Sequence, residues 1–364
     1  TMSAHTILIT GIGGLTPRSI ASVLRDKFPA KRLIGIDSNF KAIGFFMDHL
    51  VDKYLIAPRA TAEEYWHFIE RVIESERVDM AFVQPESEVI EWGRYFQSHG
   101  RFPVKVMIPP LALAEVLVDK SKMSVLLQNT DFIPKTLVIS HADPKIEQVA
   151  REIDFPCWIR ATKGSGGLGS LRVENKNNLE AWLFLHKDIP AFTVSEYLPG
   201  RHLANQMLYY KGKFIKGAAL QCAEYVMADA APSGVTGNTS YGRMLNEDAI
   251  LEFSRRCLKY IAGKVNVQPH GVFSFDLKED KSGDLKVTEI NVRHMAYTGV
   301  MANVGFDLIS DTLALLNHSE QWIPRKGYHH YDKNYIFLRD VDIEPIVLTE
   351  EKIKQTYGYL QESR

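Results

Sequence analysis

Residues 287–293 read Val287-Thr288-Glu289-Ile290-Asn291-Val292-Arg293, so an acid, an amide and a guanidinium alternate with aliphatic side chains. This alternation predicts a β-strand with Glu289, Asn291 and Arg293 on one face and Ile290 and Val292 on the other. Carboxylate and amide oxygens are ligands that suit Mg²⁺, and an arginine beside them suits a phosphate or a developing anion. The plainer alternative is a solvated strand face.

A further acid precedes this strand. Asp276 lies in the apolar run 272–277, and turn residues at 281–284 separate that run from the strand at 287–293. Two such runs around a short turn predict a β-hairpin. A hairpin would bring Asp276 and Glu289 onto the same metal ion.

The composition is that of an ordinary soluble protein. The chain has 364 residues, of which 45% are hydrophobic and 24% charged, and its formal net charge is −1. The length predicts two or three domains, and the charge gives no argument for binding to nucleic acid or a membrane. Three widely spaced cysteines, with no signal peptide or spanning segment visible in the sequence, favour a reducing cytoplasm.

The first part of the chain alternates short apolar runs, at residues 6–10, 33–36, 78–83 and 104–108, with helical patterns. Strands that alternate with helices predict a parallel sheet covered on both faces. We therefore expect an α/β chain with a doubly wound parallel-sheet domain at residues 1–110. Two further lobes of α+β character are expected at residues 111–200 and 201–364.

A glycine turn, Gly11-Ile12-Gly13-Gly14, follows the first strand, and Asp37 ends the second. The dinucleotide-binding fingerprint is G-x-G-x-x-G, and Thr16 replaces its last glycine here. Nicotinamide binding is therefore the weaker interpretation. We expect instead a tight turn at the carboxyl edge of the sheet, where the substrate would lie.

Two acids, Glu86 and Glu88, follow the strand at residues 78–83. We expect Glu88 to face the same crevice as the glycine turn. An exposed helix start is an equal alternative, because the helix dipole favours acidic side chains there.

A glycine-rich loop follows the strand that ends at Arg160 and precedes a return strand at 170–173. Glycines let backbone N–H groups wrap phosphate oxygens, so the loop is typical of one that folds over phosphates. It is not a P-loop, because it lacks G-K-[ST] and leads into a strand. A long flexible hairpin is the alternative. The residues expected to bind phosphates are Arg160, Lys163, Gly164, Ser165, Gly166, Gly167 and Gly169.

These elements, taken in order with the strand end Ser195-Glu196-Tyr197-Leu198-Pro199-Gly200, resemble the ATP-grasp superfamily. Its members include biotin carboxylase, the carbamoyl phosphate synthetase large subunit and D-alanine–D-alanine ligase. The resemblance covers nearly the whole chain. It implies a pre-ATP-grasp domain at 1–110, a lobe with the glycine-rich lid at 111–200, and a lobe with the metal triad at 201–364.

The resemblance also implies a role for individual residues. Lys120, in Val118-Asp119-Lys120-Ser121-Lys122, matches a lysine that touches ATP phosphate. Arg160 stands where the family usually has a second phosphate-binding lysine, and it keeps the charge on a bulkier, forked group. Glu196, Tyr197 and Leu198 match the hinge that receives adenine, and His202 replaces an acid that many relatives have there. The implied metal ligands, for Mg²⁺ or Mn²⁺, are Asp276, Glu289 and Asn291, and the implied catalytic residues are Asn291 and Arg293.

Within the superfamily the chain looks most similar to a group of short, single-copy proteins that are called carbamoyl phosphate synthase-like. The members of this group are commonly regarded as carboxylate–amine ligases. One lid and one metal triad are too few for carbamoyl phosphate synthesis. The resemblance implies ATP-dependent joining of a small carboxylate and an amine through an acyl phosphate, and it leaves a homodimer open. Three alternatives remain: a different ATP-dependent reaction (carboxylation with bicarbonate or simple phosphoryl transfer), a nucleotide sensor without turnover, and the nicotinamide oxidoreductase.

A second loop, at residues 230–243, is long and rich in small residues. Such loops often bind ligands, so we expect a second lid with Arg243 holding a substrate carboxylate. A disordered surface loop is the alternative. His294 is expected to be structural, and His329 and His330 to form a solvated pair.

Overall fold

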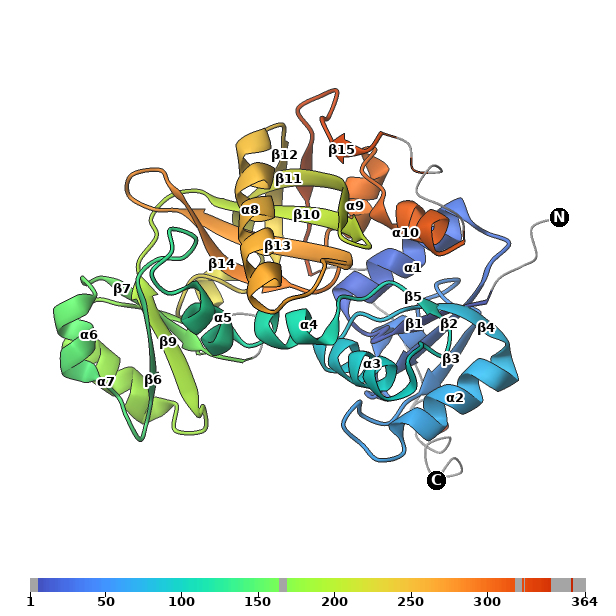
Figure 1. Cartoon of the computed structure of the whole chain (residues 1–364), viewed down its shortest axis with the longest axis horizontal. Helices are drawn as coiled ribbons and strands as arrows, with labels where there is room; N and C mark the ends of the chain where they lie inside the picture. The colour runs from blue at the N-terminus through green and yellow to red at the C-terminus, as the bar shows by residue number, and fades with distance from the viewer. Residues whose placement is uncertain (1–5, 164–168, 318–322, 324, 342–354, 356–364) are drawn as a thin grey trace.

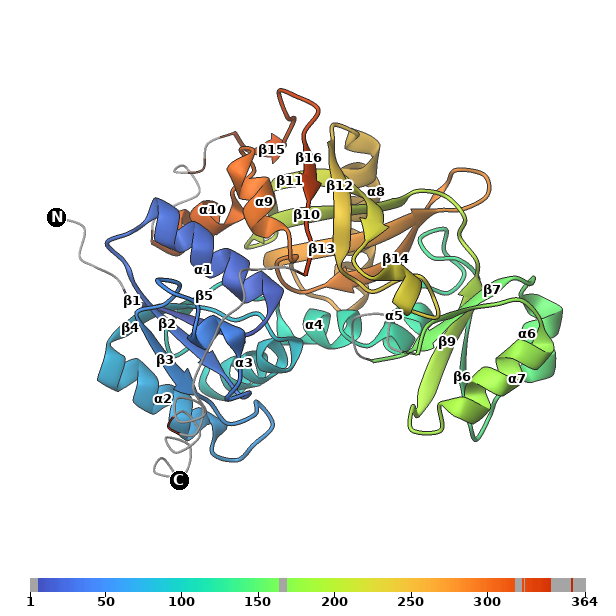
Figure 2. The same cartoon turned by 180° about the vertical axis from the view of Figure 1, so that it is seen from behind.

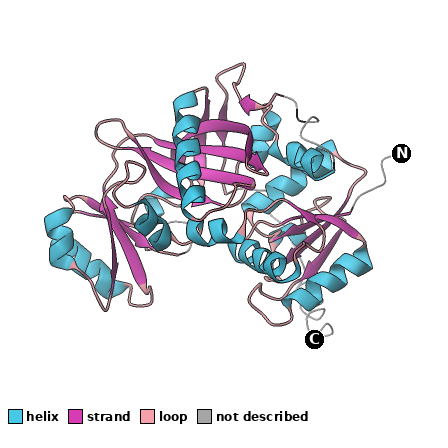
Figure 3. Ribbon diagram, viewed as in Figure 1, coloured by secondary structure: helices cyan, strands magenta, loops and turns pink. Residues whose placement is uncertain are grey.

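The computed structural model describes residues 6–163, 169–317, 323, 325–341 and 355. Within these residues the chain forms three β-sheets, of five, four and seven strands, with helices packed against each (Figure 3). None of the described helices is long and apolar enough to cross a membrane.

The N-terminal unit is built on a five-stranded parallel sheet of order β3-β2-β1-β4-β5 (Figure 1). Its strands are β1 (Thr6–Thr10), β2 (Arg32–Asp37), β3 (Lys53–Ile56), β4 (Val78–Phe82) and β5 (Lys105–Val106). The central strand β1 is buried along its whole length, as its apolar sequence requires in a sheet covered on both faces. The doubly wound parallel sheet predicted from the sequence is confirmed.

The two faces of this sheet are covered by helices from different parts of the chain. Helices α2 (Tyr65–Glu76) and α3 (Glu86–His99) pack on one face, in a core that includes Tyr65 and Trp92. Helix α1 (Leu15–Lys27) covers the other face together with α9 (Thr298–Asn303) and α10 (Leu308–Asn317). The C-terminal part of the chain therefore completes the core of the N-terminal unit.

A small lobe follows, with a four-stranded antiparallel sheet of order β6-β9-β7-β8. Its strands are β6 (Thr136–Ser140), β7 (Cys157–Ala161), β8 (Leu171–Val173) and β9 (Ala191–Glu196), and its helices are α6 (Ile146–Glu152) and α7 (Lys176–Leu185). The two helices pack against one another and share a separate core with the sheet. This lobe lies at the opposite end of the molecule from the N-terminal unit (Figure 1).

The third unit is a seven-stranded sheet of order β14-β13-β10-β11-β12-β16, to which β15 adds beside β11. Figure 2 shows β12 and β16 side by side at one edge, where they pair antiparallel. Helix α8 covers one face of the sheet and α9 the other. The bounds are β10 (His202–Tyr210), β11 (Lys213–Tyr225), β12 (Thr239–Leu245), α8 (Asp248–Lys264), β13 (Gly271–Glu279), β14 (Leu285–Asn291), β15 (Gly327–Tyr328) and β16 (Ile336–Leu338).

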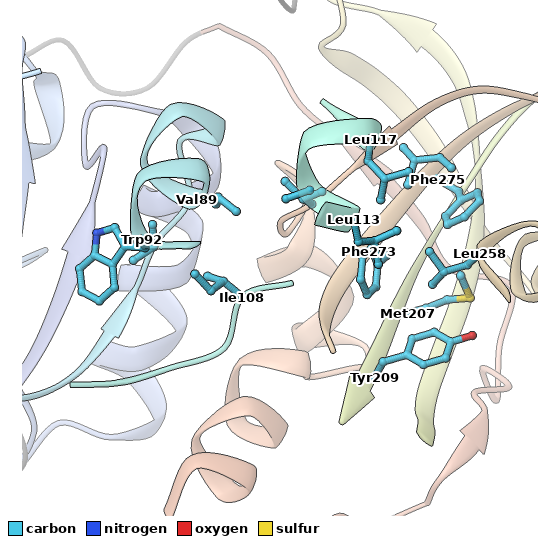
Figure 4. Packing of buried hydrophobic residues seen from close by; sticks show 14 of the residues in the cluster. Val89, Trp92, Ile108, Leu113, Leu117, Met207, Tyr209, Leu258, Phe273 and Phe275 are labelled. Atoms are coloured by element: carbon cyan, nitrogen blue, oxygen red, sulfur yellow. The ribbon is translucent and has the colours of Figure 1, made fainter. Parts of the chain in front are cut away.

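Two short helices, α4 (Leu111–Leu117) and α5 (Lys120–Leu127), link the units. Figure 4 shows Leu113 and Leu117 of α4 lying between the side chains of the N-terminal unit and those of the large sheet. Leu113 is fully buried and belongs to the same core as Trp92 and Phe273. One continuous core thus fixes the first unit against the sheet that carries the polar strand.

Candidate functional site

The polar strand lines a cavity of about 830 Å³ that the three units enclose. Each unit contributes to its wall: the N-terminal glycine turn, the small lobe, and the large sheet with the loop after β11. The wall includes Gly11, Gly14, Lys120, Arg160, Glu196, Tyr197, Leu198, His202, Asp276, Glu289, Asn291 and Arg293. Residues expected from the sequence to act together are therefore brought around one space.

Strands β13 and β14 form the predicted hairpin. Asp276 is the register partner of Glu289, and Ser274 is the partner of Asn291. The register shifts between Asp276 and Leu277, which leaves Thr288 as an extra residue in β14. This bulge lets Val287 and Ile290 both enter the hydrophobic core, while Glu289 lines the cavity. Strict alternation would have placed Val287 and Glu289 on the same face.

Lys120 forms an ion pair with the acidic face. Its ammonium Nζ lies 3.1 Å from Glu289 Oε1, although the lysine is almost fully buried. Asp119 caps helix α5 by accepting from the N–H groups of Ser121 and Lys122, and the Lys120 N–H donates to the Thr162 carbonyl. The cap and this backbone bond hold Lys120 at the start of the helix, facing the hairpin.

Arg160 reaches the hairpin from the small lobe. Its guanidinium donates to the Thr288 carbonyl, at the bulge. Burial lowers the pKa of Arg160, and the nearby carboxylates of Glu289 and Asp276 partly offset that effect. The acidic face is thus bordered by two cations from different elements, as phosphate binding requires.

Asp276 belongs to a chain of polar contacts. Asn291 Nδ2 donates to Asp276 Oδ2 at 3.5 Å, and His202 Nε2 lies 3.4 Å from Asp276 Oδ1. On its other side, His202 Nδ1 is hydrogen-bonded to the Tyr225 hydroxyl. No group of three or more His, Cys, Asp or Glu side chains within the described residues could hold a metal. The candidate set instead combines two carboxylates with the Asn291 amide, and all-oxygen sets of this kind suit Mg²⁺.

Four residues of the expected phosphate loop, Gly164 to Gly167, lie outside the described residues. The residues that border them are described. Lys163 is exposed, with Nζ 3.7 Å from Asp119 Oδ2. Gly169 has φ +63°, and a Cβ there would come within 2.7 Å of Ile189. Glycine is therefore required where the loop re-enters the sheet.

The predicted hinge contributes an aromatic and aliphatic wall. Glu196 exchanges contacts with Lys135: its N–H donates to the Lys135 carbonyl, and its carboxylate accepts the Lys135 N–H. The Tyr197 ring has the Arg172 guanidinium 4.7 Å from its centroid and the Lys278 ammonium 5.6 Å away. Tyr197 and the buried Leu198 both line the cavity, so this end suits a flat, apolar ring.

The glycine turn takes the tight form that the sequence predicts. Gly11 has φ +66°, and a Cβ there would come within 2.6 Å of Pro85. Asp37 accepts hydrogen bonds from the N–H groups of Gly13 and Asn39. This carboxylate therefore holds the turn itself, and Gly11 and Gly14 face the cavity.

The two acids after β4 differ from the expectation. Glu88 is not at the crevice but in the core, where its Oε1 accepts from the Tyr65 hydroxyl at 2.8 Å. Burial raises the pKa of Glu88 to about 7. Glu86 is partly buried, and its pKa is raised by burial and lowered by the charge of Arg293. Neither acid forms an exposed helix start, and Glu86 is the one whose carboxyl lies near the polar strand.

The second loop lies at the cavity, but Arg243, which was expected to act with it, does not. Ser233, Val235 and Asn238 line the cavity, which agrees with a binding loop. Arg243 lies farther along β12, is exposed, and donates from Nε to the Tyr241 hydroxyl at 3.0 Å. It is not among the residues of the cavity wall. The bulges between β11 and β12 change which side chains face inward before the chain reaches Arg243.

The histidines agree with the expectation only in part. His294 is buried, and its ring Nδ1 lies 3.0 Å from the Thr298 hydroxyl. Its backbone N–H donates to Gln84 Oε1, so His294 is structural as expected. His330 is exposed and lies 2.6 Å from Asp248. The expected solvated pair is wrong for His329, which is buried against Phe306 and Tyr331.

Some residues of the site were not predicted. Gln84 and Lys278 line the cavity. Neither of them was singled out in the sequence. Lys278 lies two residues after Asp276 in β13, so the two side chains share one face of the strand. This spacing was the signal in the sequence that could have placed Lys278 at the site.

Comparison with known proteins gives a consistent result. The family model described as "Carbamoyl-phosphate synthase L chain, ATP binding domain" matches residues 119–206. No curated protein matches this chain by sequence. Several solved structures are similar in fold.

N5-carboxyaminoimidazole synthetase from Staphylococcus aureus, complexed with ADP, has a TM-score of 0.70 at 12% identity, over 98% of this chain and 86% of that one. L-amino acid ligase from Bacillus licheniformis has a TM-score of 0.65 at 13% sequence identity, and the match covers 89% of this chain and 79% of that one. Biotin carboxylase from Campylobacter jejuni has a TM-score of 0.61 at 17% sequence identity, and the match covers 88% of this chain and 72% of that one.

Proposed function

We propose that this chain is an ATP-grasp carboxylate–amine ligase. The ATP-binding domain matched at residues 119–206 and the fold shared over 98% of the chain support the proposal. The protein would use ATP and Mg²⁺ to join a small carboxylic acid to an amine, releasing ADP and phosphate. The proteins of similar fold include an L-amino acid ligase and an N5-carboxyaminoimidazole synthetase complexed with ADP, which supports this class of reaction.

One observation carries the proposal. Asp276, Glu289 and Asn291 line the cavity from a single hairpin, and Arg293 lines it two residues beyond the end of β14. Lys120 and Arg160 lie against the same hairpin. Carboxylate and amide oxygens beside cations are what a magnesium–phosphate complex needs. Asp276, Glu289 and Asn291 would hold the metal, which neutralises phosphate charge when bound.

The nucleotide would extend from the hairpin to the hinge. Lys120 and Arg160 would bind phosphate oxygens, since both are held at the acidic face. Tyr197 and Leu198 would take the adenine, and His202 lies between that end and Asp276. The loop at 163–169 would close over the phosphates and exclude water.

Two steps complete the reaction. The substrate carboxylate attacks the γ-phosphorus, so an O–P bond forms and the bond to the ADP oxygen breaks. The amine nitrogen then attacks the carbonyl carbon of the acyl phosphate, the C–N bond forms, the bond to the phosphate oxygen breaks, and the ammonium proton passes to solvent. Arg293 would stabilise the oxyanion, and the protein's contribution is mainly orientation and charge.

The test is ADP release with Mg²⁺-ATP and hydroxylamine as a general amine, over a panel of amino acids, uronic acids and small carboxylates. An acid that yields both ADP and a hydroxamate supports acyl-phosphate chemistry and identifies half of the substrate pair. Release of ADP that depends on bicarbonate alone would instead indicate a carboxylase, which two of the similar structures are named for. Binding of ATP with no release under any condition would indicate a sensor.

A further inference from the structure

The N-terminus of helix α1 opens onto the cavity. Gly14, Leu15, Thr16 and Pro17 all belong to the cavity wall. The helix begins at Leu15, its N-cap residue Gly14 supplies no side-chain cap, and its first turn carries no acidic side chain. The positive end of the helix dipole therefore lies at the cavity with no carboxylate of its own turn to offset it.

Two backbone N–H groups at this end have no acceptor. The first helical hydrogen bond runs from the Arg18 N–H to the Gly14 carbonyl at 3.2 Å. The residue before Arg18 is Pro17, which has no N–H to donate. The N–H groups of Leu15 and Thr16 remain, and no atom of the described residues accepts a hydrogen bond from them. Free N–H groups at a helix start are typical of an anion-binding site.

The Thr16 side chain is a second, independent feature of this end. Thr16 is 7% exposed and lines the cavity, and its hydroxyl has no hydrogen-bond partner within the part of the chain that is described. A hydroxyl that is shielded from water and unpaired costs free energy, and a ligand in the cavity would give it an acceptor. Because the hydroxyl belongs to the same turn as the free N–H groups, one anion can accept from all three donors.

Hydrogen bonds place the start of α1 on the Arg293 side of the cavity. Gln84, also in the wall, donates its N–H to the Thr10 hydroxyl at 3.2 Å, one residue before the glycine turn. The Gln84 amide oxygen accepts from the N–H of His294, the residue after Arg293, at 3.3 Å. The hinge belongs to the small lobe, toward the opposite end of the molecule (Figure 1). A ligand at α1 would therefore be part of the substrate and not the nucleotide base.

We infer that the start of α1 binds a second anionic group of the substrate, a carboxylate or a phosphate. The reacting carboxylate must lie within bonding distance of the γ-phosphorus at the hairpin. Gln84 lies between the end of that hairpin and the glycine turn, so the two anionic groups occupy separate positions. The substrate class is then a small acid with two anionic groups. The Leu15 N–H, the Thr16 N–H and the Thr16 hydroxyl would donate to the second group, which the helix dipole also stabilises.

The inference rests on the proposed function for calling the ligand a substrate, but its test is a binding measurement that needs no turnover. The full-length protein in Mg²⁺, with and without ADP, is titrated calorimetrically with succinate, glutarate and adipate. Butyrate is the single-carboxylate match. Phosphonopropionate is the phosphonate counterpart of succinate, and the preferred probe decides between a carboxylate and a phosphate as the second group.

Three variants address the site. Thr16→Val removes the hydroxyl with little change of shape, and Thr16→Ser keeps it. Gly14→Asp gives the helix an N-cap carboxylate of its own, which would accept from the free N–H groups and repel a bound anion. Gly14 has φ −77° and ψ 157°, and a Cβ there would have its nearest non-neighbouring atom 3.3 Å away, so the substitution fits the backbone.

Two controls match these changes. Thr61→Val makes the same substitution at an exposed position, and Asn177→Asp adds one negative charge in the exposed first turn of α7. Neither residue belongs to the cavity wall. Thermal melting compares the stability of all variants. Gly14→Asp should melt no lower than the parent, because it supplies the missing cap, so weaker binding by this variant would not result from unfolding.

The expected result is that at least one probe with two anionic groups binds the parent, both controls and Thr16→Ser with similar affinity. Thr16→Val should weaken this binding by about 10-fold, as for one lost hydrogen bond to a charged group. Gly14→Asp should weaken it by about 100-fold or more, since all three donors then face a fixed negative charge.

Three results would each overturn the inference: no binding of any two-anion probe by the parent, equal affinity of the parent and Gly14→Asp, or binding of butyrate as tight as that of the dicarboxylates. Failure of the proposed ligase reaction would appear elsewhere, in ADP binding or in the hydroxamate assay. The titration without nucleotide would be unaffected by it.

Discussion

Glu289 is the side chain on which the candidate site most depends. It pairs with Asp276 across the hairpin and lies 3.1 Å from the Lys120 ammonium. Glu289→Gln removes the charge with little change of shape. We expect Mg²⁺-dependent ADP release to fall by about 100-fold or more, because an amide is a poorer metal ligand and the ion pair between Glu289 and Lys120 is lost.

Asp284→Asn provides the matched control for this variant. Asp284 lies in the turn of the same hairpin and is exposed. It should keep parental activity, since it is outside the cavity wall. Near-normal ADP release by Glu289→Gln at saturating Mg²⁺ would contradict the metal assignment.

Glu88 gives a pH-dependent prediction at the same scale. Its carboxyl is buried, with Oε1 accepting from Tyr65 and Oε2 without a partner in the described residues. Burial raises its pKa from an ordinary 4.5 to about 7. Between these values the folded protein holds a proton that the unfolded chain has lost, so the free energy of unfolding falls as the pH rises from about 4.5 to about 7.

Glu88→Gln should remove this contribution. The glutamine carbonyl still accepts from Tyr65, and no charge is buried above pH 7. We expect the variant to gain up to about 3 kcal/mol relative to the parent between pH 5 and pH 8. Denaturant unfolding at a series of pH values measures this, and a difference between the two proteins that stays constant with pH would refute it.

Among the elements, helix α5 shows how a cap can position a functional residue. Asp119 accepts from the N–H groups of Ser121 and Lys122 and so fixes the turn that carries Lys120. Asp119→Ala should lower the free energy of unfolding by about 1 kcal/mol, and it should weaken ATP binding because Lys120 loses its support. Chemical denaturation and nucleotide titration measure the two effects.

Asp119→Asn is the control for the cap, since an asparagine side chain can accept the same hydrogen bonds. It removes the charge that lies 3.7 Å from Lys163 but keeps the helix start. If Asp119→Asn loses as much ATP affinity as Asp119→Ala, the charge and not the cap is the important feature.

At the scale of the whole molecule, the N-terminal unit and the seven-stranded sheet are joined by close helix packing. Gly299 of α9 donates its N–H to the Ser19 hydroxyl of α1, and a Cβ at position 299 would come within 2.4 Å of that oxygen. Gly299→Ala should therefore lower the free energy of unfolding by about 1 to 3 kcal/mol, because the helices must separate. It should also weaken substrate binding between the two units.

Gly263→Ala is the matched control, because Gly263 lies near the end of α8 with open space around its missing side chain. Alanine there should leave stability unchanged or raise it by up to about 1 kcal/mol. Thermal unfolding compares the two variants. Combining Ser19→Ala with Gly299→Ala should recover stability, and the absence of recovery would show that the contact with Ser19 is not the cause.

Local patterns in the sequence were sufficient for much of the fold and for the centre of the site. The parallel sheet, the hairpin and the polar face of β14 follow from periodicities of apolar and polar residues, which depend on neighbours close in the chain. The glycine turn was recognisable for the same reason. Lys120, Arg160, Asp276, Glu289, Asn291 and Arg293 all lie where their motifs predicted, around one cavity.

Other features are decided by residues far apart in the chain, and no local pattern reports them. Strict alternation gives Glu289 the same face as Val287, and the bulge at Thr288 corrects this because Val287 and Ile290 both pack in the core. Arg243 looks suitable in the sequence for holding a substrate carboxylate. The packed structure leaves its side chain exposed and outside the cavity wall, because burial is a property of the packed molecule and not of the strand.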